Sequence, residues 1–139
     1  MASTENNSSE NVTLRFIVQI TQHPIFKEPY KLYVVGNIDE LRNWNPHEGI
    51  EMPQVSEERL EASIIISKNI QKIIEYKYVN ITKNGAQVNW EHGENRTIRQ
   101  IDSEFLQIQD QFRVSYTKYC CDFRLRNLLF FLRNVRIQI

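Results

Sequence analysis

The feature that most constrains the fold of this chain is a series of short strand-like segments separated by turns, with no helical period before residue 117. Residues 12–20 alternate apolar with mostly polar side chains, which is the period of a strand with one buried face. Residues 30–35 are predicted to form a second strand, which Gly36 closes. Further strands are predicted over residues 60–67, 72–82, 87–90, 97–101 and 112–116. Short strands at this spacing predict an all-β, immunoglobulin-like antiparallel β-sandwich of about seven or eight strands.

Two of the connections also carry information. Asn84-Gly85 is a strong hairpin signal and turns the chain back into the strand that ends at Trp90. Residues 37–54 are rich in turn-forming side chains and carry Trp44.

The chain of 139 residues fits one domain with polar or basic ends. Residues 1–11 lack a hydrophobic cluster and are predicted to be a disordered leader, so the folded module is expected over residues 12–116. Residues 117–139 form either a basic amphipathic tail, which can become a short helix, or a non-native end. The apolar residues at helical spacing in that tail are Leu125, Leu128, Leu129 and Leu132.

The charge of the chain and its lack of targeting signals limit the partners and the cell compartment that we expect. Formal net charge is zero, although residues 1–112 hold 11 basic against 16 acidic side chains and residues 113–139 hold 6 against 1. This balance gives no general attraction to nucleic acid or to an anionic membrane. The polar start has no signal-peptide pattern, and the apolar run at residues 128–132 is too short to cross a bilayer. Adjacent Cys120 and Cys121 favour reduced thiols, so we expect a cytoplasmic protein without a transmembrane segment.

Sequence patterns typical of catalysis are missing. The chain has no G-x-S-x-G, H-E-x-x-H, P-loop or C-x-x-C pattern. His23, His47 and His92 do not share a metal-ligand spacing. We therefore predict a protein that is not an enzyme and has neither metal nor cofactor.

Two tryptophans stand in the most polar stretches, where a core aromatic would be out of place. Trp44 is surrounded by Asn, Asp, Arg and Pro, and Trp90 is followed by Glu, His and Gly. A large aromatic normally buries its area inside the protein. When it is held in a polar loop, it can offer a flat face to a sugar ring, whose C–H groups form an apolar plane. Lys77, Glu91 and Asn95 are candidates for the polar contacts that sugar hydroxyls require.

These residues carry a resemblance to a known family. Gly36 with Trp44 eight residues later, then Glu75-Tyr76-Lys77-Tyr78, then Trp90-Glu91 followed by Asn95-Arg96, resembles the family 20 carbohydrate-binding module, the starch-binding domain. The resemblance covers residues 12–116. It implies a non-catalytic β-sandwich that binds α-1,4-glucan, such as starch, glycogen or maltooligosaccharides. The roles it implies are a platform of Trp44 and Trp90, with Lys77, Asn95 and the adjacent Glu91 beside it.

The chain departs from the family pattern at three positions. Arg42 follows Leu41 where the family has Gly, so a turn with positive φ would be costly here. The family's Trp at the start of the strand over residues 60–67 is missing. Many members of the family have a second glucan site built on tyrosines. In this chain only Phe26 and Tyr30 lie near one part of it, and residues 53–59 offer no aromatic for the other part.

Two alternatives to an independent binding module remain open. The chain could be a truncated glucan-targeting module of a larger enzyme, such as an amylase, glucan phosphatase, dikinase or phosphodiesterase. It could also be a sandwich used only for contact with an unknown protein partner.

Overall fold

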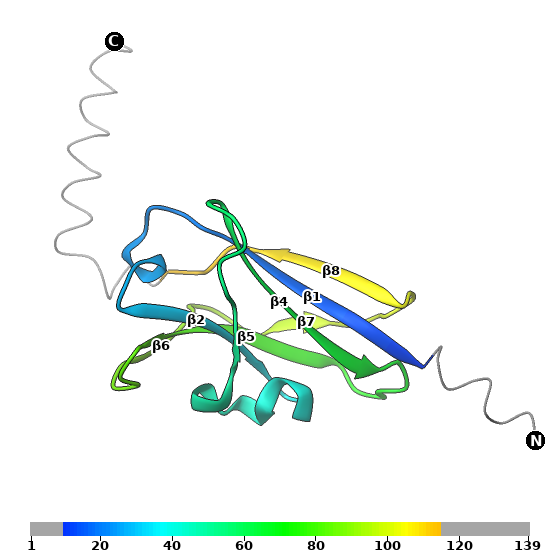
Figure 1. The fold of residues 1–139 in the computed structure, drawn as a ribbon. Helices are drawn as coiled ribbons and strands as arrows, with labels where there is room; N and C mark the ends of the chain where they lie inside the picture. Colours follow the sequence, from blue (N-terminus) through cyan, green and yellow to red (C-terminus); the bar gives the residue numbers. More distant parts are fainter. Residues whose placement is uncertain (1–9, 115–139) are drawn as a thin grey trace, which may run out of the picture.

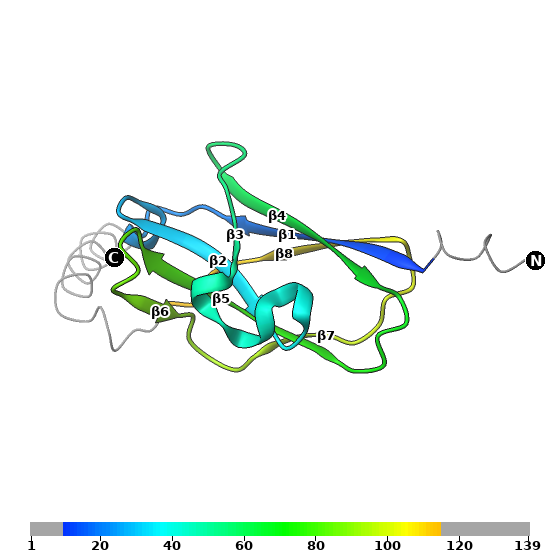
Figure 2. The same ribbon diagram turned by 60° about the horizontal axis from the view of Figure 1, so that its bottom comes forward.

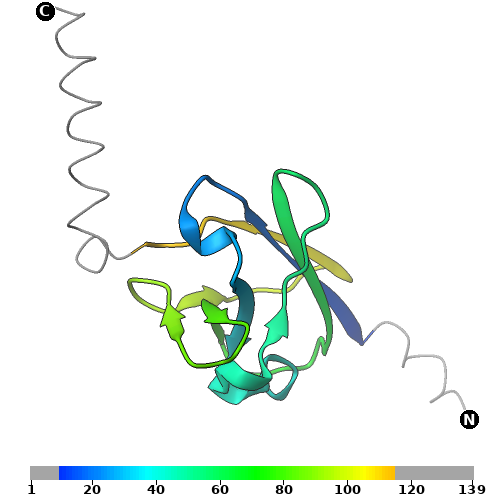
Figure 3. The same cartoon turned by 60° about the vertical axis from the view of Figure 1, so that its left-hand side comes forward.

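The structure is a computed structural model that describes residues 10–114. In this part of the chain, two β-sheets pack face to face (Figure 1). The three-stranded sheet has the order β4 (Arg59–Ser67), β1 (Asn11–Gln19) and β8 (Phe105–Asp110). The five-stranded sheet has the order β3 (Ile50–Glu51), β2 (Tyr30–Gly36), β5 (Ile74–Thr82) and β6 (Val88–Trp90), with β7 (Arg96–Ile98) also paired to β5. The predicted all-β sandwich is confirmed, and Figure 3 shows its two layers from the side.

Most predicted strands lie within one or two residues of the observed bounds, but the last one was wrong. Residues 112–116 were expected to complete a sheet, whereas β8 is formed by Phe105–Asp110 and the described chain beyond it has no strand. The alternation of Leu106 and Ile108 with exposed neighbours is the signal for this strand. The pairing of β8 with β1 is parallel, while the other strand pairs are antiparallel.

The core lies between the sheets because each long strand buries one of its two faces. On β1 the fully buried positions Val12, Leu14, Phe16 and Val18 are two residues apart, as the strand period requires. The facing side chains of β5 include Tyr76, whose ring meets Phe16 edge to face with centroids 5.1 Å apart. Burial of each such side chain contributes about 1.5–3 kcal/mol.

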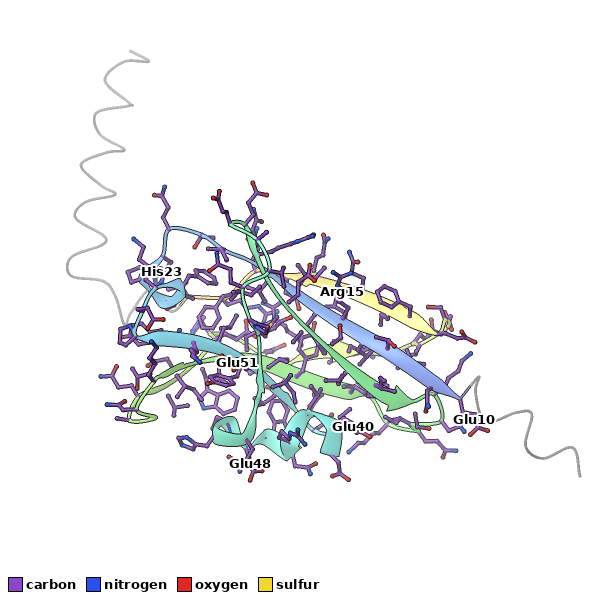
Figure 4. All side chains as sticks on the ribbon, viewed as in Figure 1. Glu10, Arg15, His23, Glu40, Glu48 and Glu51 are labelled. Carbon is purple, nitrogen blue, oxygen red and sulfur yellow. The ribbon has the colours of Figure 1, made fainter. Side chains whose placement is uncertain are left out.

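The connection between β2 and β3 covers part of the outer face of the five-stranded sheet. It contains two 3-10 turns, η2 (Asp39–Trp44) and η3 (Pro46–Glu48), which Figure 2 shows in front of that sheet. Figure 4 places Glu40 and Glu48 on these turns and Arg15 on the opposite layer. A shorter turn, η1 (Pro24–Phe26), precedes β2.

The predicted hairpin at Asn84-Gly85 is confirmed. Gly85 has φ 73°, and its N–H donates to the Thr82 carbonyl, so the chain reverses between β5 and β6. Strand β1 begins at Asn11, one residue before the predicted module. The predicted leader before residue 10 and the predicted tail lie outside the described residues. Among the described residues, no helix is long and apolar enough to cross a membrane.

Candidate functional site

The candidate site is built on an interruption along one edge of β5. Strand β6 pairs with this edge through Trp90 opposite Val79, and β7 pairs with it through Arg96 opposite Tyr76. Residues 91–95 form a loop between these two pairings, in which Glu91 still bonds to Tyr78 and residues 92–95 leave the edge. This 91–95 loop lies next to Trp90 at its start and ends in Asn95.

Trp90 points outward because side chains alternate along β6. It lies opposite Val79 and is 40% exposed, while the next residue, Glu91, is buried. The predicted outward placement of Trp90 therefore follows from strand geometry.

Trp44 reaches the same surface from the connection after β2. Arg42, Asn43 and Trp44 have φ values of 65°, 49° and 65°, so this turn adopts the positive φ that the family's Gly would provide. The turn is fixed by buried Leu41 and by a hydrogen bond of 2.6 Å from Asn43 Nδ2 to Asp39 Oδ1.

The two indoles lie together on the outer face of the five-stranded sheet. Their ring centroids are 6.3 Å apart and their planes are inclined by 57°. We call Trp44 and Trp90 the tryptophan platform. Trp44 packs on an outer apolar cluster whose buried members are Val35, Val79 and Ile81, and Tyr33 and Val88 pack there as well. The sheet thus supports two large aromatic rings at an angle to each other.

Two of the predicted polar contacts are Lys77, which lies beside the 91–95 loop, and Asn95, which ends it. Lys77 is on β5, two residues from Val79 and on the same face, and its Nζ donates to the Gly93 carbonyl at 2.6 Å. An ammonium group has three donors, so this bond leaves capacity for a ligand. Asn95 is exposed at the end of the loop.

Glu91 lies beside the platform as predicted, but its side chain points inward and is fully buried. Its Oε2 accepts from the Tyr78 backbone N–H and from Arg96 Nε, each at 2.9 Å, and its Oε1 accepts from Arg96 Nη2 at 2.9 Å. The Glu91 N–H donates to the Tyr78 carbonyl. Glu91 therefore satisfies the strand edge where β6 has ended, and is placed to support the site rather than to touch a ligand.

Arg96 joins this edge to the other sheet. Its Nη1 lies 3.0 Å from Asp110 Oδ1 at the end of β8, and its Nη2 donates to the Gln111 carbonyl. Arg96 thus supports the end of the loop by hydrogen bonds to Glu91 and Gln111. Asp110 also accepts hydrogen bonds from the Tyr76 and Tyr78 hydroxyls, at 2.7 Å and 2.8 Å.

Burial and charge shift the proton equilibria of this network. Burial disfavours the charge on Arg96, but hydrogen bonds and attraction from Glu91, with Asp110, outweigh it and raise the Arg96 pKa. Burial, followed by the effect of Asp110, raises the pKa of Tyr76 and of Tyr78. The network therefore favours charged Arg96 and neutral tyrosines.

Three residues that contribute to the site were not predicted from the sequence. Tyr33 packs with Trp44 in the outer cluster, Asp110 anchors Arg96, and Arg113 contacts the 91–95 loop. The alternation along β2 could have placed Tyr33 beside Val35. The contacts of Asp110 and Arg113 join distant segments, and no local pattern indicates them.

Phe26 and Tyr30, the aromatics considered for a second glucan site, line different cavities. Phe26 lines a cavity of about 420 Å³ with Phe112 and Val114, whereas Tyr30 lines another, of about 470 Å³, with Lys83 and Gln87. Within residues 10–114 there is no group of three or more His, Cys, Asp or Glu side chains that could hold a metal ion.

A search against known families matches residues 11–106 to the family described as the starch binding domain. The glucoamylase-1 of Schizophyllum commune is 36% identical over 67 residues, which cover 48% of this chain and 11% of that protein. A cyclomaltodextrin glucanotransferase of Bacillus sp. (strain 1-1) is 38% identical over 72 residues, covering 48% of this chain and 10% of that protein. The chain thus spans about a tenth of the length of these relatives.

Solved structures share the fold. The family 20 carbohydrate-binding module of the maltotetraose-forming amylase from Pseudomonas saccharophila superposes with a TM-score of 0.54 at 19% identity, covering 71% of this chain and all of that one. The family 15 glucoamylase of Hypocrea jecorina gives a TM-score of 0.62 at 19% identity, over 75% of this chain and 17% of that enzyme.

Proposed function

This chain belongs to the starch-binding domain family, and we propose that it binds α-1,4-glucan on the tryptophan platform, with Lys77 and Asn95 as hydrogen-bonding partners. The observation that carries this assignment is the pair of indoles inclined by 57°, with Trp90 40% exposed. An α-1,4-glucan is curved, so two tilted planes can each stack on a different glucose unit. A domain of this family is a non-catalytic binding module.

The proposed chemistry is stacking combined with a few hydrogen bonds. Aromatic stacking contributes about 0.5–1.5 kcal/mol per contact beyond burial. Each hydroxyl hydrogen bond adds a net ~1 kcal/mol. An open platform should therefore bind short maltooligosaccharides only weakly, with a Kd of roughly micromolar to millimolar. Starch or glycogen gains from many overlapping sites on each chain.

Glu91 has a supporting role in this proposal. Its carboxylate is bonded to Arg96 and Tyr78, so it fixes the backbone directly after Trp90. Lys77 has two roles, since it holds Gly93 and has donors left for the sugar.

The test is retention on insoluble starch with elution by soluble maltooligosaccharide. We expect Trp90→Ala to weaken binding at least about tenfold, because a platform residue makes its contacts in the complex. The melting temperature should change little, since the ring is 40% exposed.

A matched control is available on the other sheet. Phe105 is a similarly exposed aromatic, 49% exposed on β8, and Phe105→Ala should bind starch as the parent chain does. Equal losses from both variants, or normal binding by Trp90→Ala, would contradict the platform assignment. Failure of the folded parent chain to bind starch would favour a sandwich used for protein contact.

A second candidate is that the module targets a larger enzyme to glucan. The observation in its favour is that the chain spans only 11% and 10% of the two enzymes it resembles. An antibody against this domain would then detect a much longer polypeptide in the source cells. Detection of a species of about the size of this chain alone would exclude that candidate.

A further inference from the structure

The segment after β8 lies directly against the 91–95 loop. Arg113 makes three contacts there: its carbonyl accepts from the His92 N–H at 2.8 Å, its N–H donates to Glu91 Oε1 at 3.4 Å, and its Nη1 donates to the Glu94 carbonyl at 2.7 Å. We propose that Arg113 is a positioning residue of the glucan site, which holds the 91–95 loop in the shape that presents Asn95. This inference rests on the proposed function.

The contact at Gly93 shows how closely the arginine follows the loop. Gly93 has φ 93°, a conformation that side chains rarely adopt. A Cβ at this position would lie 3.3 Å from Arg113 Nη1 and 3.5 Å from its Cδ. The side chain of Arg113 therefore lies alongside Gly93, the loop residue with the greatest backbone freedom, and restricts the movement of the loop there.

The loop has few other supports. Residues 92–95 are exposed, and the backbone between Glu91 and Arg96 makes no ladder with β5. Lys77 holds the Gly93 carbonyl, and Arg113 holds the next carbonyl, that of Glu94. Asn95 follows immediately, so these two cations set the direction in which its side chain leaves the loop.

A loop that is already fixed in its binding conformation binds more tightly, because less conformational entropy is lost when the ligand binds. The guanidinium is charged at neutral pH, and its hydrogen bond to a carbonyl is of the strong, charge-assisted kind. Arg113 is itself exposed, so its removal leaves no buried group unsatisfied. Removing this exposed side chain should therefore change glucan binding without changing the stability of the fold.

Arg113 also lies outside the residues that the family match covers, which end at 106. It is joined to the network through its own segment, since the Gln111 carbonyl accepts from Arg96. The end of the described chain is thereby linked to the loop of the glucan site.

The experiment compares Arg113→Ala and Arg113→Lys with Arg99→Ala, a control at another exposed arginine. Soluble maltooligosaccharide is the probe, and its Kd is measured beside a thermal melt. We expect Arg113→Ala to bind roughly tenfold more weakly with a nearly unchanged melt, because a charge-assisted bond is lost. Arg113→Lys should recover part of this loss, since an ammonium can still donate to the Glu94 carbonyl. Arg99→Ala should bind normally.

A double-mutant cycle then tests the route through the loop. In an Asn95→Ala background, Arg113→Ala should cost little, because the group it positions is gone. In a Trp44→Ala background it should again cost roughly tenfold, because Trp44 is held by a different turn. Full additivity with Asn95→Ala would overturn the inference, as would normal binding by Arg113→Ala or a loss of binding accompanied by loss of the cooperative melt.

The outcomes also separate this inference from the proposed function. If Trp90→Ala and Asn95→Ala weaken binding while Arg113→Ala does not, only the role of Arg113 is overturned. If the parent chain does not bind the oligosaccharide, both proposals are overturned.

Discussion

At the residue scale, the turn that carries Trp44 is the most strained feature of the site. Three successive residues, Arg42, Asn43 and Trp44, have positive φ, and none of them is glycine. Such a conformation costs roughly 1–2 kcal/mol for a residue with a Cβ. The buried Leu41 side chain fills the space over Gly36, where a Cβ would collide with Leu41 and with the Glu75 carbonyl. Packing at the start of the turn thus fixes the strained residues that follow.

The first prediction concerns Arg42. Replacing Arg42 with Gly removes the left-handed strain but adds the chain entropy of glycine, about 0.5–1 kcal/mol. We therefore expect Arg42→Gly to raise the free energy of unfolding by up to about 1 kcal/mol. Urea denaturation measures this directly. Arg42→Ala keeps the Cβ and should give no increase, so equal stabilisation by both variants would contradict the strain argument.

At the element scale, a single carboxylate continues the pairing of β5 where β6 stops. The Glu91 side chain accepts from the Tyr78 N–H, and its backbone N–H donates to the Tyr78 carbonyl, so both polar groups of Tyr78 are satisfied. Arg96 then returns the chain to the same edge as part of β7. The loop can therefore leave the sheet while the backbone N–H and carbonyl of Tyr78 on the strand edge keep their hydrogen-bond partners.

We predict that Glu91→Gln destabilises the fold by roughly 1.5–3 kcal/mol, because the largely buried Arg96 loses one of its two carboxylate partners and keeps only Asp110. The free energy of unfolding is the quantity to measure. Glu51→Gln is the matched control, since its ion pair with Lys31 is solvent-exposed and should contribute little to the free energy of unfolding. Similar losses of unfolding free energy in the two variants would show that burial does not make the Glu91–Arg96 pair more important for stability than an exposed pair.

At the scale of the whole molecule, Asp110 connects the two sheets. It lies at the end of β8 and accepts from the hydroxyls of Tyr76 and Tyr78 on β5. Arg96 stands beside the same carboxylate and over the Tyr78 ring, 5.4 Å from its centroid. These contacts place polar groups at one border of an otherwise apolar core.

This arrangement predicts unfolding at alkaline pH. In the folded chain, burial and Asp110 raise the pKa of Tyr76 and Tyr78, while in the unfolded chain both ionise near pH ~10. Below that pH the tyrosines are neutral in both states, so their contribution to stability is constant. Above it, only the unfolded state releases the protons, so stability falls as pH rises.

Tyrosinate absorbance recorded together with circular dichroism checks this prediction. Two of the six tyrosines in the sequence should ionise only as the β-structure is lost. A variant with both Tyr76→Phe and Tyr78→Phe should show a shallower loss of stability above pH ~10. Ionisation of Tyr76 and Tyr78 in a folded chain would contradict the burial of these hydroxyls.

The sequence by itself determined the strands that have a clear local period. The segment that became β1 alternates apolar with mostly polar residues, those that became β4 and β5 are rich in β-branched residues, and the Asn84-Gly85 turn is encoded in two residues. It also indicated both members of the tryptophan platform, because a large aromatic within polar neighbours is a local anomaly. Strand β8 was missed although its alternation is present, because the apolar residues that begin at Phe112 offered a competing strand.

Only the tertiary structure decided which of the polar residues near Trp90 are exposed and which are buried in the supporting network. Glu91 and Asn95 look equivalent in the sequence, yet strand alternation and the pairing with Arg96 turn Glu91 inward and leave Asn95 exposed. Arg113 reaches the 91–95 loop from nearly twenty residues away, as its bond to Glu94 shows. Such contacts depend on how β8 returns beside β1 and brings its end to the loop, and a non-local pairing of this kind leaves no periodic trace in the chain.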